Sequence, residues 1–202
     1  MPLSLLFTEA GWIAALQTLG AWLVPILIAF TTLGYEEFYL LVVPFTYWCM
    51  DSGLGMRLGA MLMFSQATNS LFKLVFHAPR PYWINSDVTA YSAETSFGAP
   101  SGHAQISLSM WGAAAAWFRR RWVTILCAVI IFMIGFSRIY LGVHFISDVL
   151  IGWIIGGLLL FAVLRWEKPF ITRFIRFSLW RQLTLIALGA AFFFCVFGLI
   201  QQ

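Results

Sequence analysis

Seven apolar runs follow one another along the chain, and they constrain its fold more than any other feature. A helix needs about 20 mainly apolar residues to cross the hydrocarbon core of a bilayer. Inside that core, only helices and closed barrels pair every backbone polar group. The charge content agrees with a membrane protein, because 10% of the residues are charged, against about 25% in a typical soluble domain. We therefore predict an all-α, polytopic transmembrane helical bundle of about six or seven spans.

The boundaries of the expected spans follow from where each apolar run begins and ends. Pro25 interrupts the first run and is able to kink that helix. Three glycines in the sixth run, Gly152, Gly156 and Gly157, predict close approach of another helix. The expected spans are 13–33, 38–50, 58–76, 100–118, 123–136, 149–164 and 183–200.

The segments between the apolar runs are short, and we predict their positions from composition. We expect residues 1–12 at the membrane interface and a loop over residues 51–57. The basic and aromatic stretch 165–181 predicts an amphipathic helix that lies on the membrane surface. Because no soluble region or internal repeat interrupts the pattern, residues 1–202 form one predicted integral membrane domain. Its motif core is 73–148, and 183–200 is a possible additional C-terminal span.

The distribution of basic residues predicts an orientation in the membrane. If the loops after the second, fourth and sixth spans share one side, that side holds nine of the twelve Lys and Arg. By the positive-inside rule it is cytoplasmic, which places the N-terminus inside and the C-terminus outside a plasma (inner) membrane. The remaining basic residues would face the extracytoplasmic side. The nine are Arg57, Arg119, Arg120, Arg121, Arg165, Lys168, Arg173, Arg176 and Arg181.

The three other basic residues belong to polar clusters within otherwise apolar sequence. Each cluster has an ordinary structural explanation: a solvated anchor, a helix cap, or a polar seam between packed helices. However, placing one Arg or Asp at the middle of a membrane costs about 2.5–3.5 kcal/mol of insertion free energy. Charged residues in such segments therefore usually have a function. The clusters are Lys73 with Arg80-Pro81, then Pro100-Ser101-Gly102-His103, and then Ser137-Arg138 with His144 and Asp148.

Together the clusters predict a site for a phosphoryl group. Lys73, Arg80 and Arg138 supply three fixed cations, and guanidinium groups match phosphate oxygens in pairs. Ser101-Gly102 lies at an expected helix start, where free backbone N–H groups and the helix dipole bind anions. The carboxylates are too scattered for an oxygen-ligand cage, so we expect no metal and no cofactor.

The two histidines of these clusters predict covalent catalysis. His144 and Asp148 are four residues apart, which on a helix is one face, so the carboxylate can orient the imidazole and make it more basic. His144 is the candidate nucleophile, which would form a phosphohistidine. His103 is the candidate general acid for the leaving oxygen and the base for water in the second step.

These clusters, in this order and spacing, resemble the three-part signature of the type 2 phosphatidic acid phosphatase family, itself similar to glucose-6-phosphatase and vanadium haloperoxidases. All three parts match without substitution over 73–148. The resemblance implies a metal-independent phosphatase with His144 as nucleophile, His103 as acid and base, and phosphate ligands at Lys73, Arg80, Ser101, Gly102 and Arg138. Bacterial membrane members commonly have six spans. Either 183–200 is therefore an addition or one of the early spans is not transmembrane.

Several substrates and functions remain open from the sequence. A membrane-embedded site favours a lipid phosphate: undecaprenyl diphosphate, phosphatidic acid or phosphatidylglycerophosphate. Arg80-Pro81-Tyr82-Trp83 and Glu94-Thr95 are also similar to glucose-6-phosphatase, and the aromatic pair could stack on a soluble sugar phosphate. A lipid or ion transporter and a haloperoxidase relative are further alternatives. The expected partners are the lipid phosphate and the bilayer, with no nucleic acid.

Overall fold

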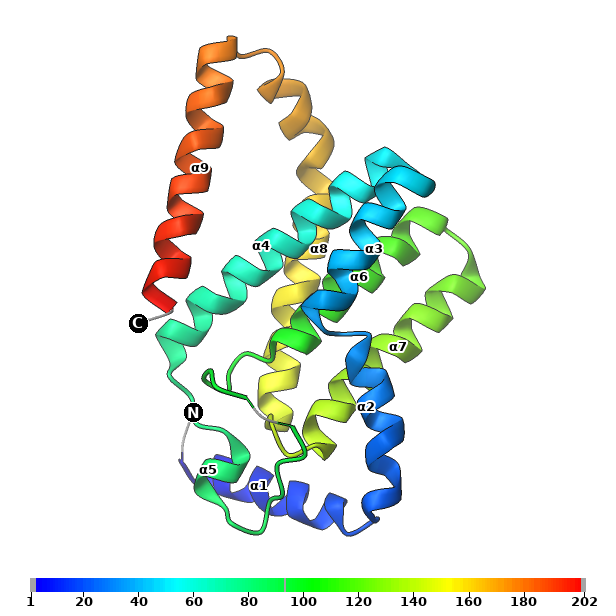
Figure 1. Cartoon of the computed structure of the whole chain (residues 1–202), viewed down its shortest axis with the longest axis vertical. Helices are drawn as coiled ribbons and strands as arrows, with labels where there is room; N and C mark the ends of the chain where they lie inside the picture. The colour runs from blue at the N-terminus through cyan, green and yellow to red at the C-terminus, as the bar shows by residue number, and fades with distance from the viewer. Residues whose placement is uncertain (1–2, 93, 201–202) are drawn as a thin grey trace.

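The computed structural model describes residues 3–92 and 94–200, and all the regular elements of this part of the chain are helices, which confirms the predicted fold class (Figure 1). The ends of the predicted domain, residues 1–2 and 201–202, lie outside the described residues. The elements are α1 (Leu3–Gln17), η1 (Ala21–Leu23), α2 (Val24–Thr32), α3 (Glu36–Cys49), α4 (Ser52–Phe76), α5 (Pro81–Ile84), α6 (Gly102–Phe118), α7 (Arg121–Tyr140), α8 (Ile146–Phe174) and α9 (Leu179–Ile200).

Helix α6 lies at the centre of the bundle, where it packs against α4, α7 and α8. Two of the three predicted glycine contacts are confirmed at the α6–α8 interface. A Cβ atom at Gly152 would lie 2.7 Å from the carbonyl oxygen of Ser101, and one at Gly156 would lie 2.5 Å from that of Gln105. At Gly157 a Cβ would make only ordinary contact, 3.7 Å from Leu108. The glycines therefore bring the start of α8 directly against the start of α6.

The expected single span 13–33 is wrong, because the chain turns sharply within it. Helix α1 ends at Gln17, Gly20 adopts φ 110°, and α1 and the η1–α2 segment meet at 88°. A positive φ of this size is readily available to glycine alone, so the bend falls at Gly20. Pro25 lies in the first turn of α2, where its missing N–H costs nothing.

As a consequence of this bend, α1 lies at the same end of the bundle as the polar motifs (Figure 1). Gln17 donates to the carbonyl oxygens of Thr89 and Tyr140, at 2.7 and 2.8 Å. Glu9, only 5% exposed, accepts from the backbone N–H and the hydroxyl of Ser147, at 3.1 and 3.0 Å. The predicted N-terminus on the opposite side from the motifs is therefore wrong.

Helices α2 and α3 rise one after the other from the α1 end of the bundle (Figure 1). They are nine and 14 residues long and are separated by the turn at 33–35. At 1.5 Å per residue, α3 spans about 21 Å, less than the roughly 30 Å of a hydrocarbon core. The interruption places the chain just before α3 against α6 and α7, where a Cβ atom at Gly34 would lie 3.1 Å from His103 and 2.8 Å from Ile134.

Two further expectations about the connections are wrong. Residues 52–57 are helical, because the Asp51 carboxylate accepts from the Leu54 N–H at 2.7 Å and caps α4 there. The stretch 165–181 is not a separate surface helix, since α8 continues to Phe174 and α9 begins at Leu179. An ion pair of 2.6 Å between Arg57 and Glu167 fixes the extended end of α8 to α4.

The outward surface of the helices fits a lipid environment. Helices α7 and α8 are each long and apolar enough to cross a membrane. Large side chains on α8 point outward, with Leu158, Phe161 and Leu164 each 57–64% exposed. Soluble monomers rarely expose contiguous apolar surface of this kind. The basic ends of α4, α6 and α8 are in contact, because Arg57 pairs with Glu167 and its guanidinium lies 5.0 Å from the centroid of the Trp117 ring.

Candidate active site

The turn between α7 and α8 presents His144 and Asp148 to each other. Helix α7 ends at Tyr140, and the N–H groups of Val143 and His144 donate to the Arg138 carbonyl at 3.2 and 3.3 Å. His144 thus precedes α8, and the predicted placement of His144 and Asp148 on one helical face is wrong. The two meet because the Asp148 carboxylate reaches back over the helix start.

One oxygen of Asp148 serves two donors at the start of α8. Oδ2 accepts from the Phe145 N–H at 3.0 Å and lies 3.4 Å from His144 Nδ1. The latter distance is longer than an ordinary N–H···O bond, a length common in catalytic pairs before substrate binds. Both side chains are buried, at 2% and 1% exposure. Asp148 can therefore fix the tautomer that leaves His144 Nε2 free.

The electrostatic surroundings keep His144 neutral. Burial lowers the pKa of the imidazole well below its usual range, and the cations Arg80, Arg138 and Lys73 lower it further. A neutral ring has the free electron pair that a nucleophile requires.

The start of α6 is fixed from two directions. The Ser101 N–H donates to the Asp148 carbonyl at 3.0 Å, which joins this turn to the start of α8. From α4, the Asn69 amide donates to the Pro100 carbonyl at 3.2 Å and to Gln105 Oε1 at 3.0 Å. Gln105 in turn donates to the Ser65 carbonyl at 2.7 Å. Neither Asn69 nor Gln105 was assigned to the site from sequence, although polar residues within apolar runs were a signal.

The arginine of the first cluster is fully buried and is held by backbone carbonyls. Arg80 Nε donates to the Ser96 carbonyl at 2.7 Å, and Nη1 donates to the Val143 carbonyl at 2.8 Å. Lys73 Nζ donates to the Ser96 hydroxyl at 2.7 Å. Arg80 therefore connects the long loop 77–99 to the turn that carries His144.

Glu94 joins the two buried arginines and was not predicted as a site residue. Its Oε1 forms an ion pair with Arg138 Nη2, and its Oε2 lies 3.7 Å from Arg80 Nη2. Arg138 also donates to the Thr31 hydroxyl at 3.0 Å. The signal in the sequence was a carboxylate in the loop between two basic motifs. The sequence could not show which arginines Glu94 would contact, because that depends on the path of the loop.

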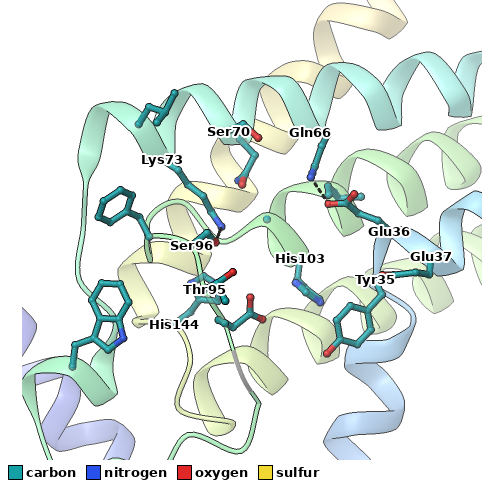
Figure 2. Close-up of a pocket in the computed structure, with 18 residues that line it drawn as sticks. Tyr35, Glu36, Glu37, Gln66, Ser70, Lys73, Thr95, Ser96, His103 and His144 are labelled. Atoms are coloured by element: carbon teal, nitrogen blue, oxygen red, sulfur yellow. Dashed lines mark hydrogen bonds between the residues drawn. The ribbon is translucent and has the colours of Figure 1, made fainter. Parts of the chain in front are cut away.

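A cavity of about 580 Å³ opens among these elements (Figure 2). Four of the predicted site residues line it: Lys73, Gly102, His103 and His144. The other four, Arg80, Ser101, Arg138 and Asp148, lie behind the wall and are at most 1% exposed. Glu94 and Ser96 line the cavity in front of the arginines.

Unpartnered polar atoms gather on the predicted residues. Among the described residues, six buried side-chain N or O atoms have no hydrogen-bond partner. Four of the six are Ser101 Oγ, His103 Nε2, Arg138 Nε and Asp148 Oδ1. Buried polar groups are nearly always paired, so such a group is explained by a catalytic or ligand-binding role. This concentration marks the site as built for a polar ligand.

The cavity continues past His103 into a region that the sequence did not predict. The ring of Tyr35 packs edge-on against His103, with centroids 4.7 Å apart. Glu36 and Glu37 follow in the first turn of α3, and Glu36 accepts a hydrogen bond from Gln66 of α4. Figure 2 shows His103 between this group and the group of Lys73, Ser96 and His144.

Fold and site together define a membrane-embedded phosphatase. Residues 54–172 match the family model described as the PAP2 superfamily, and the chain belongs to that family. It is 30% identical over 170 residues to phosphatidylglycerophosphatase B of Bacillus subtilis, covering 74% of this chain and 78% of the relative. It is 28% identical over 170 residues to human glucose-6-phosphatase 3, covering 72% of this chain and about half (49%) of that relative.

A solved structure supports the same assignment. The fold is similar to the crystal structure of the first transmembrane PAP2 type phosphatidylglycerolphosphate phosphatase from Bacillus subtilis, with a TM-score of 0.65 and 25% sequence identity. The match covers 87% of this chain and 96% of the other. The predicted family and phosphatase activity are thereby confirmed.

Proposed function

We propose that the protein hydrolyses a phosphomonoester or diphosphate of a membrane lipid through a phosphohistidine on His144. The observation that carries this proposal is that His144, oriented by Asp148, lines one cavity with His103, Lys73 and the helix start at Gly102. A nucleophile, an acid and two anion-binding groups are the parts that phosphoryl transfer requires.

In the first step, His144 Nε2 attacks phosphorus while the bond from phosphorus to the leaving oxygen breaks. The electron pair of that bond stays on the leaving oxygen, which takes a proton from His103. In the second step, His103 takes a proton from water as the water oxygen bonds to phosphorus and the bond to His144 breaks. Phosphate leaves, and both histidines regain their starting protonation states.

The two buried arginines bind the phosphoryl group in place of the Glu94 carboxylate. Because Glu94 engages both Arg80 and Arg138, the incoming phosphoryl oxygens replace its carboxylate between the two guanidinium groups. Ser101, Gly102 and Lys73 supply the remaining phosphate contacts. These cations then stabilise the charge of the transferring group, the largest expected electrostatic effect.

Two features support a lipid as the substrate. Leu74, Trp83 and Phe97 are apolar residues of the cavity wall, against which an acyl or prenyl chain could lie. The surrounding helices expose apolar side chains, so the cavity is within reach of lipids. Phosphatidylglycerophosphate, phosphatidic acid and undecaprenyl diphosphate all carry the required group, and the Bacillus relative is named for the first of them.

A soluble sugar phosphate is the second candidate substrate. Trp83 is 48% exposed and lines the cavity, so its indole ring is available to stack on a sugar. The similarity to glucose-6-phosphatase 3 supports this candidate.

We also propose that the cavity faces the extracytoplasmic side of a plasma (inner) membrane. The basic ends of α4, α6 and α8 meet where Arg57 contacts Glu167 and Trp117, and the positive-inside rule makes that side cytoplasmic. We further propose one domain, with its motif core at 73–148. A cysteine introduced at Asn85 should react with a membrane-impermeant thiol reagent in intact cells. Protection there would contradict this orientation.

Phosphate release tests the activity itself. The purified protein, in detergent with EDTA, should release inorganic phosphate from phosphatidic acid, phosphatidylglycerophosphate or undecaprenyl diphosphate, and vanadate should inhibit it. A higher kcat/KM for glucose 6-phosphate than for every lipid would favour the second candidate. Release of phosphate from none of these compounds would overturn the proposed function.

A further inference from the structure

We infer that the cavity region formed by Tyr35, Glu36, Glu37 and Gln66 binds the leaving group and selects phosphomonoesters with a hydroxyl or ammonium group next to the ester. We call these four residues the leaving-group region. The inference rests on the proposed function, because it uses His144 as nucleophile and His103 as acid. It goes further by stating which alcohols the site accepts.

The direction of the reaction assigns this region to the leaving group. In phosphoryl transfer, the attacking and leaving atoms lie roughly in line through phosphorus. The leaving oxygen must therefore be on the side of phosphorus away from His144, within reach of His103. His103 Nε2 is buried and unpartnered, as expected for a group that meets a ligand. Beyond His103 the cavity wall consists of Tyr35 and the first turn of α3 (Figure 2).

The position of this region is set by the break between α2 and α3. A Cβ atom at Gly34 would lie 3.1 Å from His103 Cδ2 and 2.8 Å from Ile134, so only glycine permits this approach of the chain. The residues that follow, Glu36 and Glu37, then line the cavity with exposed side chains, so a ligand that enters the cavity can reach both carboxylates.

The chemistry of the region favours hydrogen-bond donors and cations. Glu36 and Glu37 carry the only carboxylates of the wall on this side of His103, among the described residues. Glu36 is held by the Gln66 amide, which leaves its second oxygen as an acceptor. A vicinal hydroxyl would donate to this oxygen, and an ammonium would also gain charge attraction.

The same region disfavours diphosphates. When a lipid diphosphate is cleaved, the leaving group is itself a phosphomonoester anion. That anion would lie beside two carboxylates, whereas Lys73, the one cation among the described residues of the wall, is on the other side of His103 (Figure 2). Like charges at such a distance repel, and low local dielectric strengthens the repulsion.

A matched set of four compounds tests the inference on the wild-type enzyme: dodecyl phosphate, 2-hydroxydodecyl phosphate, 2-aminododecyl phosphate and dodecyl diphosphate. Because the phosphoryl group and chain are shared, differences in kcat/KM report the leaving group, and comparison with the Glu36→Gln variant separates contact with the leaving-group region from the intrinsic reactivity of each compound. We expect the hydroxyl and amino compounds to exceed dodecyl phosphate about tenfold or more, the scale of one hydrogen bond to a charged group. Dodecyl diphosphate should be the poorest substrate.

Substitution of Glu36 assigns the preference to this region. In Glu36→Gln, the ratio of kcat/KM for the amino compound over dodecyl phosphate should fall about tenfold, while the hydroxyl compound keeps more of its advantage. Asp87→Asn is the matched control, since Asp87 is an exposed carboxylate outside the cavity wall, and it should keep the wild-type ratio.

The outcomes separate the two proposals. Equal kcat/KM for the three phosphomonoesters, or a preference for dodecyl diphosphate, would overturn the leaving-group assignment and leave the phosphatase mechanism standing. No hydrolysis of any compound would instead contradict the proposed function. The wild-type measurements decide the inference even if Glu36→Gln fails to fold, and an unchanged ratio in a folded Glu36→Gln would also overturn it.

Discussion

The two halves of the cavity differ in charge, burial and origin. The half around His144 is formed by the three motifs; its two arginines are fully buried and paired with Glu94 and with backbone carbonyls. The half beyond His103 belongs to the break between α2 and α3, with carboxylates that are exposed at the opening. A buried cationic half can bind the phosphoryl group that all substrates share. An open acidic half can distinguish the alcohols that carry it.

The largest effects should come from the two histidines at the boundary between these halves. His144→Ala should reduce kcat by about 10⁴-fold or more, as removal of a catalytic nucleophile does. His103→Ala should reduce it by about 10²–10⁴-fold, the usual contribution of general acid catalysis. Phosphate release measures both. Arg119→Ala, at the far end of the bundle, is the control and should retain wild-type activity; equal activity in all three variants would contradict the mechanism.

The next largest effect should come from the buried arginine on α7. Arg138→Lys keeps the positive charge but loses the planar guanidinium group, whose two terminal nitrogens contact Thr31 and Glu94 at the same time. We expect kcat to fall about 10²-fold, near the cost of removing one donor to the transition state. Arg121→Lys, at the opposite end of the same helix, should have no effect on kcat. Full activity in Arg138→Lys would mean that the geometry of the guanidinium does not matter.

Substitution of Glu94 should have a moderate effect, and it should strengthen anion binding instead of weakening it. Because its carboxylate competes with the incoming anion for both arginines, Glu94→Gln should bind vanadate roughly tenfold more tightly, the scale of one charge-assisted hydrogen bond. The inhibition constant measures this, with Asp87→Asn of the same loop as control. Weaker vanadate binding in Glu94→Gln would show that the carboxylate positions the arginines and does not stand in for phosphate.

The smallest effect should arise in the acidic half. Gln66→Leu removes the amide that holds Glu36, and we expect kcat/KM for the 2-hydroxydodecyl compound to change by a few fold, near the net value of one ordinary hydrogen bond. The vanadate inhibition constant should stay at its wild-type value, since vanadate occupies the cationic half. A parallel loss of vanadate binding would show that the two halves are not independent.

The half of the cavity around His144 could be predicted from the sequence, because the residues that indicate it lie in three short motifs. Lys73, Arg80, His103, Arg138 and His144 are ionisable groups within or beside apolar runs, and their spacing carries the family signature. Their detailed contacts were less accessible. His144 and Asp148 meet across a helix start instead of along a helix face, since α8 begins only at Ile146.

The helix pattern was predictable where a run had a single interpretation. Spans within α6, α7 and α8 follow from continuous apolar sequence, whereas the bend at Gly20 and the continuation of α8 past 165 do not. Apolar composition gives the tendency to form a helix in a membrane, but it carries little information on where a helix reverses. Those reversals depend on contacts such as Arg57 with Glu167 and Gln17 with Thr89.

By itself, the sequence determined that this is an all-helical membrane phosphatase, because composition and motif spacing are properties of short stretches. The assignment of its chemistry to the motif residues stays a prediction. Only the tertiary structure decided that Glu94 lies between Arg80 and Arg138, and that Glu36 lies beyond His103. Both positions depend on how the loop 77–99 and the break before α3 cross the motif helices. The energy of such contacts is shared between distant segments, so no single stretch of sequence specifies them.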